Sequence, residues 1–195
     1  MSYSRGLFTV VLAAVMVLTA APVGQADNRL GNYGHWKVRD FPAPARVKFL
    51  DHTGTPWPVH DAAIKWDEAA NIDVDWEVAG AYSNCGAECV RVRALANDED
   101  PLFGPNCTGA AGYWTNYAPD ASYHWGEGNE VRLNRSCNSE SGSYKKAIVC
   151  HELGHALGLD HSSSTGSCMY KYAGGAASTP GEHQYNMLDS VIYDH

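Results

Sequence analysis

Residues between positions 151 and 161 have the types and spacing of a metal-dependent hydrolytic site. His151 and His155 are four positions apart, so on an α-helix their imidazoles project from one face, one turn apart. Gly158 can adopt the left-handed conformation that ends a helix, and the following turn would bring His161 back to the same ion. We therefore expect His151, His155 and His161 to bind one zinc ion.

The acidic residue within this segment suggests what the metal would do. Three nitrogen ligands leave one position of a tetrahedral zinc ion open for water, which distinguishes a catalytic site from a closed structural one. Zinc lowers the pKa of a bound water toward about 7. Glu152 directly follows the first histidine, where it could accept a proton from that water and pass it to a leaving amine. The pattern therefore predicts peptide-bond hydrolysis, with Glu152 as the general base.

A second segment strengthens this interpretation. Ser167-Cys168-Met169-Tyr170 follows closely, and HExxHxxGxxH followed by such a methionine resembles the signature of the metzincin zinc metallopeptidases. The stretch from His151 to Ser162 and the Met169-Tyr170 pair are most similar to the matrixins. The resemblance implies that Met169 packs as an apolar base beneath the imidazoles and binds no metal, which is close to the role of an ordinary core methionine.

Position 171 departs from the related patterns. Astacins and serralysins have a metal-reaching tyrosine two residues after the methionine, where this chain has Lys171, so we expect no tyrosine ligand. Matrixins usually have a proline directly after Met-Tyr, and Lys171 replaces it. Because this residue would belong to the wall of the specificity pocket, the substrate preference of the family is not carried over.

The first 26 residues have the pattern of a secretory signal peptide. Arg5 precedes an apolar run from Leu7 to about Ala21, and small residues lead to a predicted cleavage after Ala26. The run is shorter than the roughly 20 residues that a membrane-spanning helix needs. We expect a secreted, extracellular protein whose residues 27–195 form a single metalloprotease catalytic domain.

The charge balance limits the expected partners. The formal net charge is -8, and without Arg5 the chain keeps 13 Lys and Arg against 22 Asp and Glu, a net charge of -9. Such a surface repels nucleic acid and anionic membranes, so neither is expected as a partner. The expected partner is a protein or peptide substrate, and we expect a monomer.

Six cysteines, all after the signal peptide, fit three disulfides formed in an oxidising compartment. Sequence alone leaves fifteen connectivities open for six cysteines. One pairing would join the cysteine before His151 to the cysteine before Met169, two elements that should pack together; a second would close a short loop. The favoured set is Cys150–Cys168, Cys85–Cys89 and Cys107–Cys137. No cysteine precedes Cys85, so we expect no cysteine switch of the matrixin kind.

Hydrophobic patterning predicts both strands and helices, and the metzincin resemblance implies that they form an α+β fold. The expected strands are 46–50, 72–78, 90–94, 112–119 and 129–134. A first helix is expected from its apolar stripe of Val59, Ala63, Trp66 and Ala70. The active-site helix should begin at Ser143, and a last helix at about 180–193 should pack behind it. The acidic face of 72–78 and the basic face of 90–94 suit a hairpin. The metzincin resemblance instead implies a twisted, mostly parallel five-stranded sheet in which 46–50 lies between them and 112–119 is an antiparallel edge.

Matrixins also carry a second zinc site and calcium loops near the edge strand. The segment 120–130 contains His124, Glu127 and Glu130 but lacks the multi-histidine spacing of that second site. Asp98-Glu99-Asp100 is expected to be a solvated turn. Structural Ca²⁺ therefore remains open, and one catalytic Zn²⁺ is the cofactor that we expect.

We consider two alternatives to an endopeptidase function. One is a secreted zinc-containing protein that binds peptide without catalysis, although a binding module has no need of Glu152 at its position. The other is a structural metal domain, which would normally have four protein ligands. Zinc content and proteolysis of a Glu152→Ala variant would separate all three.

Overall fold

The computed structural model of the chain describes residues 30, 35–36, 44–54, 56–80, 83–116, 125, 128–172 and 175–194. The predicted signal peptide at 1–26 lies outside these residues, as does all of 117–127 except Trp125. Among the helices of the described part, none is long and apolar enough to cross a membrane.

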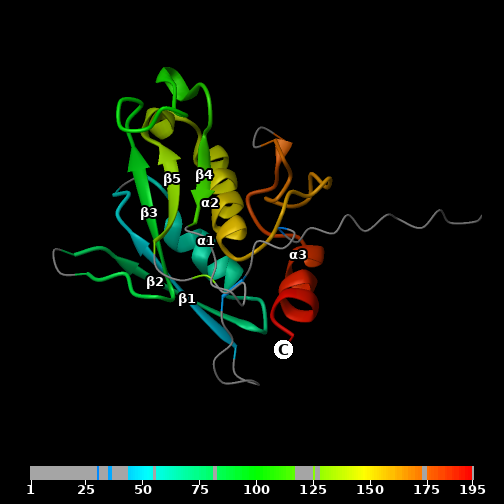
Figure 1. Ribbon diagram of the computed structural model, residues 1–195. Helices are drawn as coiled ribbons and strands as arrows, with labels where there is room; N and C mark the ends of the chain where they lie inside the picture. Colours follow the sequence, from blue (N-terminus) through cyan, green and yellow to red (C-terminus); the bar gives the residue numbers. More distant parts are fainter. Residues whose placement is uncertain are drawn as a thin grey trace, which may run out of the picture.

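One mostly parallel sheet forms the centre of the fold (Figure 1). Its strands are β1 (Ala45–Asp51), β2 (Ile72–Val78), β3 (Cys89–Leu95), β4 (Gly112–Thr115) and β5 (Asn129–Asn134), in the order β2-β1-β3-β5-β4. β1 pairs in parallel with β2 and β3, β3 pairs in parallel with β5, and β4 is antiparallel to β5. The strand order implied by the resemblance is confirmed, and the hairpin suggested by the charge pattern is wrong.

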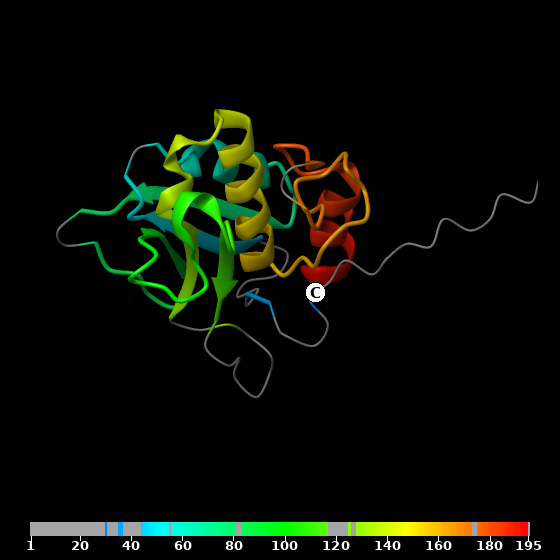
Figure 2. The same cartoon turned by 90° about the horizontal axis from the view of Figure 1, so that it is seen from above.

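The two longer helices lie on the same face of this sheet (Figure 2). Helix α1 (Val59–Trp66) packs against α2 (Gly142–Ala156), and α2 lies over β4 and β5. The C-terminal helix α3 (Glu182–Met187) continues as a π-helical segment, Leu188–Ile192, close to the predicted range. Just beyond it, the Tyr193 hydroxyl donates to the carbonyl of Leu157 at 2.9 Å, which fixes this end of the chain against the end of α2.

Helix α1 is shorter than the predicted apolar stripe. It ends at Trp66, and the carboxylate of Asp67 then accepts the backbone N–H of Val74 at 2.8 Å. The chain turns after Trp66, so Ala69 is buried and Ala70 is exposed. The inclusion of Ala70 in the buried stripe is therefore wrong.

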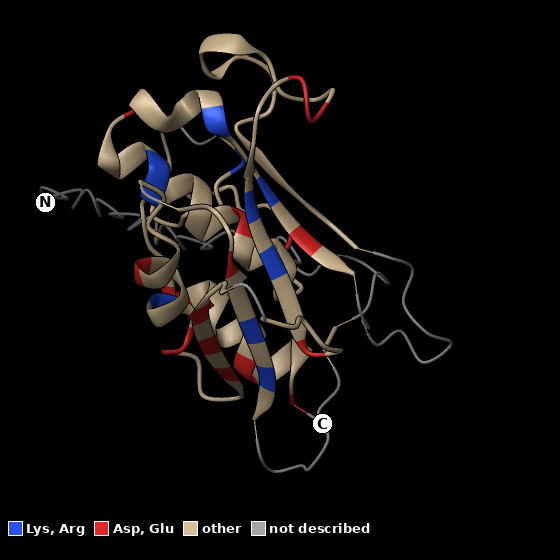
Figure 3. Ribbon diagram, turned by 90° about the vertical axis from the view of Figure 1, so that its left-hand side faces the viewer, with Lys and Arg blue, Asp and Glu red and all other residues tan. Residues whose placement is uncertain are grey.

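Charged residues recur along the strands of the sheet (Figure 3), and several of them pair between neighbouring strands. Lys48 on β1 donates to the carboxylate of Glu77 on β2 at 2.9 Å, and Arg93 on β3 lies 3.1 Å from Glu130 on β5. The acidic residues of β2 are thus paired with β1 rather than with β3. Because exposed ion pairs contribute little, the parallel order is better explained by burial of the sheet face that the helices cover.

That buried face and the helices enclose the main core. Its largest fully buried side chains include Phe49 and Leu133 from the sheet, Trp66 from α1 and Leu153 from α2. The Trp66 indole N–H also donates to the carbonyl of Cys150 at 3.0 Å, so the contact between α1 and α2 is polar as well as apolar. The core therefore lies directly beneath the segment that carries the histidines.

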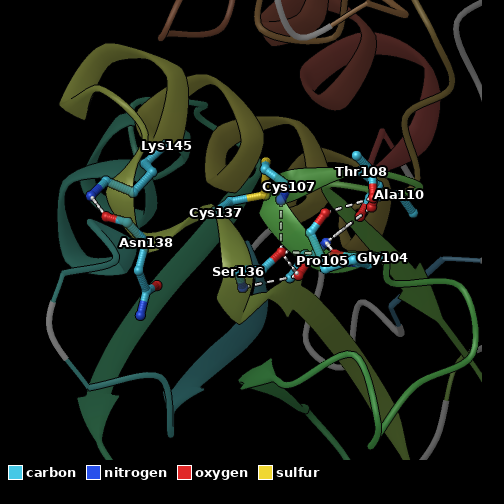
Figure 4. Close-up of a disulfide and its surroundings, with 10 residues drawn as sticks. Gly104, Pro105, Cys107, Thr108, Ala110, Ser136, Cys137, Asn138 and Lys145 are labelled. Atoms are coloured by element: carbon cyan, nitrogen blue, oxygen red, sulfur yellow. Dashed lines mark hydrogen bonds between the residues drawn. A yellow bond between two sulfur atoms is a disulfide. The ribbon is translucent and has the colours of Figure 1, made fainter.

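The disulfides are Cys85–Cys89, Cys107–Cys137 and Cys150–Cys168, as predicted. The first packs against Leu50 in a small cluster separate from the main core. The second joins two short 3₁₀ turns at Pro105–Cys107 and Arg135–Ser139 (Figure 4). The third joins α2 to the segment that contains Met169.

Polar contacts hold the loop before β4. The side-chain amide of Asn134 lies within 3.3 Å of the carbonyls of Gly104, Thr108 and Ala110. Asp98 and Glu99 are exposed, as predicted for a solvated turn.

Asp100, by contrast, is only 1% exposed. Its carboxylate accepts hydrogen bonds from the Tyr113 hydroxyl and, at 3.1 Å, from Arg132. The prediction of a solvated turn is thus wrong for Asp100, whose partners lie on β4 and β5 and are distant in sequence.

Candidate active site

Two of the three predicted histidines project from α2. The helix begins after Ser141, whose hydroxyl accepts the backbone N–H of Tyr144 at 3.2 Å, and it has run for two and a half turns when it reaches His151. The Nε2 atoms of His151 and His155 are 3.0 Å apart. The i, i+4 spacing thus places the two nitrogens together, as expected.

The turn after α2 adds the third histidine. Gly158 has φ of +99°, a conformation that a residue with a side chain adopts only with strain. The chain reverses there, and one ring nitrogen from each of His151, His155 and His161 lies within 4.8 Å of the others. Among the described residues this is the one group of three such side chains close enough to share a metal ion.

The second nitrogen of two of these rings is already engaged. His151 Nδ1 lies 2.8 Å from the carbonyl of Cys168, and His155 Nδ1 lies 2.7 Å from the carbonyl of Leu159. Since a carbonyl only accepts, each Nδ1 must carry the proton, which leaves each Nε2 with a free lone pair. Three convergent imidazole nitrogens are a donor set that zinc prefers, so the residues present fit this metal.

Burial keeps two of these rings neutral. It lowers the pKa of His151 to about 4 and the pKa of His155 to about 3, and the neighbouring histidines act in the same direction. Hydrogen bonds to the Cys168 and Leu159 carbonyls oppose the shift but do not reverse it. Both rings are therefore in the metal-binding form at neutral pH.

Glu152 lies beside this triad and is 7% exposed. Burial raises the pKa of its carboxyl group to about 8, against the opposing effect of a hydrogen bond with the backbone of Trp114 on β4. A cation held by the histidines would lower this pKa again, because a nearby positive charge favours the carboxylate. The site therefore contains a carboxyl group whose proton affinity lies near the range that general-base catalysis requires.

Met169 packs against the helix that carries two of the histidines. It is fully buried, and its side chain packs against Gly154, which lies on α2 between the two helical histidines. The backbone N–H of Ser162 donates to the carbonyl of Met169 at 2.6 Å, so the segment after His161 is fixed to the methionine segment. The segments that carry the three candidate ligands are thus both in contact with the methionine segment.

The triad opens into a cleft of about 730 Å³. Edge strand β4 lines the same cleft, with Gly112, Tyr113 and Trp114. Trp114 lines the cleft and also packs against Trp125, with ring centroids 4.9 Å apart. The cleft therefore places an extended backbone edge beside the histidines.

Sequence reasoning missed several residues that line this cleft. They are Leu30, Gly109, Ala111, Tyr144, Ile148, Asp160 and Tyr172. Tyr144 and Ile148 could have been found, because they precede Glu152 at helical spacing on α2, and Asp160 directly precedes His161. The others come from separate segments that only the tertiary fold brings together. Of the residues considered for a second metal site, His124 and Glu127 lie outside the described residues, and Glu130 is paired with Arg93 and Arg132.

Comparisons with known proteins agree with the motif. Human (Homo sapiens) matrix metalloproteinase-17 is 29% identical over 145 residues, which cover 74% of this chain and 23% of that protein. The chain thus spans about a quarter of the length of this relative.

Similar solved structures include myroilysin, a metalloproteinase and a hatching enzyme. Myroilysin is 16% identical, with 90% of this chain and 98% of that chain covered and a TM-score of 0.45. Metalloproteinase-II from Bacteroides fragilis is 11% identical, with 85% and 58% covered and a TM-score of 0.45. High choriolytic enzyme 1, a hatching enzyme zinc-protease from the medaka fish Oryzias latipes, is 15% identical, with 67% and 52% covered and a TM-score of 0.37.

The assignment itself rests on a family match in sequence. The sequence model of the matrixin family matches residues 24–184, which is well over half of the chain and includes the whole histidine motif and the methionine segment. The chain therefore belongs to the matrixin family of zinc metalloendopeptidases.

Proposed function

We propose that this protein is a secreted zinc endopeptidase in which His151, His155 and His161 bind the catalytic zinc and Glu152 acts as general base and then as general acid. The observation that carries this proposal is the convergence of three imidazoles beside a buried carboxyl group in one cleft. When bound there, zinc would lower the pKa of a water molecule and polarise the scissile carbonyl.

Glu152 would move one proton in two steps. Its carboxylate accepts a proton from the attacking water and then donates it to the nitrogen of the leaving amine. Burial favours the protonated form that exists between these steps, and the contact with the Trp114 backbone restrains the carboxyl group. The hydrogen bonds from His151 and His155 to backbone carbonyls hold their rings in one orientation throughout.

The substrate would be a protein or peptide bound in extended form. β4 pairs with β5 on one side only, and no described strand pairs with its other side, so apart from the Trp114 group that bonds Glu152 this edge can hydrogen-bond to a peptide backbone. Backbone pairing at an edge strand requires an extended substrate. We therefore propose that unfolded segments and loops of proteins are cleaved in preference to regular structure.

The location follows from the sequence and the disulfides. We propose that residues 1–26 are a signal peptide and that residues 27–195 form a single catalytic domain, active outside the cell as a monomer. The three disulfides support an oxidising compartment. The net charge of -8 gives no support for binding nucleic acid or anionic membranes.

The test compares zinc content and proteolysis in the wild type and in Glu152→Ala. We expect both proteins to hold one equivalent of zinc, and we expect the variant to lose about 10²- to 10⁴-fold in the rate of cleavage of an unfolded protein. Glu140→Ala, a change at an exposed glutamate just before α2, is the matched control and should retain full activity. Equal activity of Glu152→Ala and the wild type would refute the assigned base. A zinc-loaded wild type that binds peptide but never cleaves it would favour the non-catalytic alternative.

A further inference from the structure

Lys171 and Tyr172 line the same cleft as the three histidines. Both side chains are exposed, and the Lys171 ammonium lies 4.9 Å from the centroid of the Tyr172 ring. The Tyr172 ring in turn stands edge-on to the Tyr170 ring, at a centroid distance of 5.7 Å. A contact between a cation and an aromatic face positions the ammonium without neutralising its charge.

Lys171 differs in its partners from the other described lysines. Three of these, Lys48, Lys65 and Lys146, form ion pairs at 2.6 to 2.9 Å with carboxylates, and Lys145 donates to the carbonyl of Asn138 at 2.8 Å. Within the part of the chain that the structure describes, Lys171 is the one lysine with no oxygen partner. Its charge therefore remains available to a molecule in the cleft.

The backbone that carries Lys171 is fixed relative to the metal site. Tyr170, the preceding residue, forms a β-bridge with Ser162, which directly follows His161. Cys168 N–H donates to the carbonyl of Thr179 at 2.8 Å, and the disulfide to Cys150 joins this segment to α2. The backbone that leads to Lys171 is therefore held to the segments that carry the histidines.

The acidic side chains of the cleft leave Lys171 free. The Asp160 carboxylate accepts the backbone N–H of His161 at 2.6 Å, and Glu152 is buried beside the triad. We propose that Lys171 is a specificity-determining residue, and that the enzyme prefers substrates with an acidic side chain close to the scissile bond. This inference rests on the proposed function, because it concerns substrate choice at the same site.

The experiment measures cleavage preference in the wild type and in Lys171→Met, which keeps the length of the side chain and removes its charge. Both proteins digest the same library of unfolded peptides, and mass spectrometry identifies the residues around each cleavage site. A peptide cleaved by both is then synthesised with Glu, Gln or Lys at the position where acidic residues are enriched. We expect the wild type to favour Glu over Lys in kcat/KM, and Lys171→Met to reduce this ratio by about two- to fivefold, the effect of one partly exposed ion pair.

Two further variants and a control make the outcome decisive. Lys171→Glu should reverse the preference, while Lys171→Arg should keep it. Lys65→Met, at a half-buried lysine on α1 outside the cleft, should leave the ratio unchanged. Zinc content and thermal midpoint should match the wild type in every variant, because Lys171 contacts only Tyr172 among the polar or aromatic groups described.

The failure of this inference is distinct from the failure of the proposed function. An active wild type with no preference for Glu over Lys would overturn it, and so would a preference that survives in Lys171→Met. If the proposed function were wrong, the wild type itself would show no zinc-dependent cleavage, whatever residue stands at position 171.

Discussion

At the scale of single residues, Met169 restricts which residue can occupy position 154. A Cβ atom at Gly154 would lie 2.7 Å from Cζ2 of Trp66 and still closer to the sulfur of Met169. Both neighbours are fully buried and cannot move freely. The glycine between the two helical histidines is therefore a packing requirement, additional to the ligand spacing itself.

We predict that Gly154→Ala lowers the free energy of unfolding by about 1–3 kcal/mol, the usual cost of overpacking a core. Zinc affinity should fall as well, because any shift of α2 at this point separates His151 from His155. Urea denaturation and zinc titration measure the two effects. The matched control is Gly142→Ala at the start of the same helix, where a Cβ meets no atom within 4 Å and no loss is expected. If Gly154→Ala were as stable as the control, the close contact with Met169 would be wrong.

At the scale of elements, the features that sequence could predict are those with a short-range signal. The helical spacing of His151 and His155 and the turn at Gly158 are local, so the geometry of the triad followed from the motif. Strand alternation located β2 and β5 with correct bounds. The order of the strands required the family resemblance, because the charges on the exposed face suggested a different pairing.

Features that depend on distant partners could not be read from the sequence. Asp100 looked like part of a solvated acidic run, yet its partners Tyr113 and Arg132 are 13 and 32 residues away. The end of α1 was placed too late because the bond between Asp67 and Val74 is not visible in a hydrophobic pattern. In both cases the observed structure depends on a polar contact between residues that meet only in the folded chain.

The disulfide between α2 and the methionine segment provides a prediction at this scale. Removing it by the double change Cys150→Ala and Cys168→Ala should cost about 3 kcal/mol in the chain-entropy account. It should also weaken zinc binding, because the carbonyl of Cys168 accepts the Nδ1 proton of His151. Removing Cys85–Cys89, which closes a loop with a sequence separation of only 4, should cost about 2 kcal/mol and leave zinc affinity unchanged. Equal zinc affinity in both double variants would contradict the proposed coupling.

At the scale of the whole molecule, segments far apart in sequence complete the active-site region. The backbone N–H of Leu30 donates to the carbonyl of Gly158 at 3.0 Å, and Leu30 lines the cleft. The indole N–H of Trp36 donates to the carbonyl of Ala156 at 2.7 Å, across 120 residues of sequence. Both contacts satisfy carbonyls near the end of α2, where the helix no longer supplies partners of its own. Leu30 and Trp36 therefore support the turn that delivers His161.

The contribution of the Trp36 hydrogen bond can be isolated by making the same substitution, Trp to Phe, at two buried tryptophans. Trp36→Phe removes the donor to the Ala156 carbonyl next to His155, so we expect a loss of about 1–3 kcal/mol in unfolding free energy, together with weaker zinc binding. Trp57 is also buried, but its indole N–H has no hydrogen-bond partner in the described part of the chain. Trp57→Phe removes a similar volume and relieves a buried unpaired donor, so it should be less destabilising and should not change zinc affinity. Chemical denaturation and zinc titration of the two variants compare the effects directly. Equal losses would show that ring volume alone, rather than the hydrogen bond to α2, explains the role of Trp36.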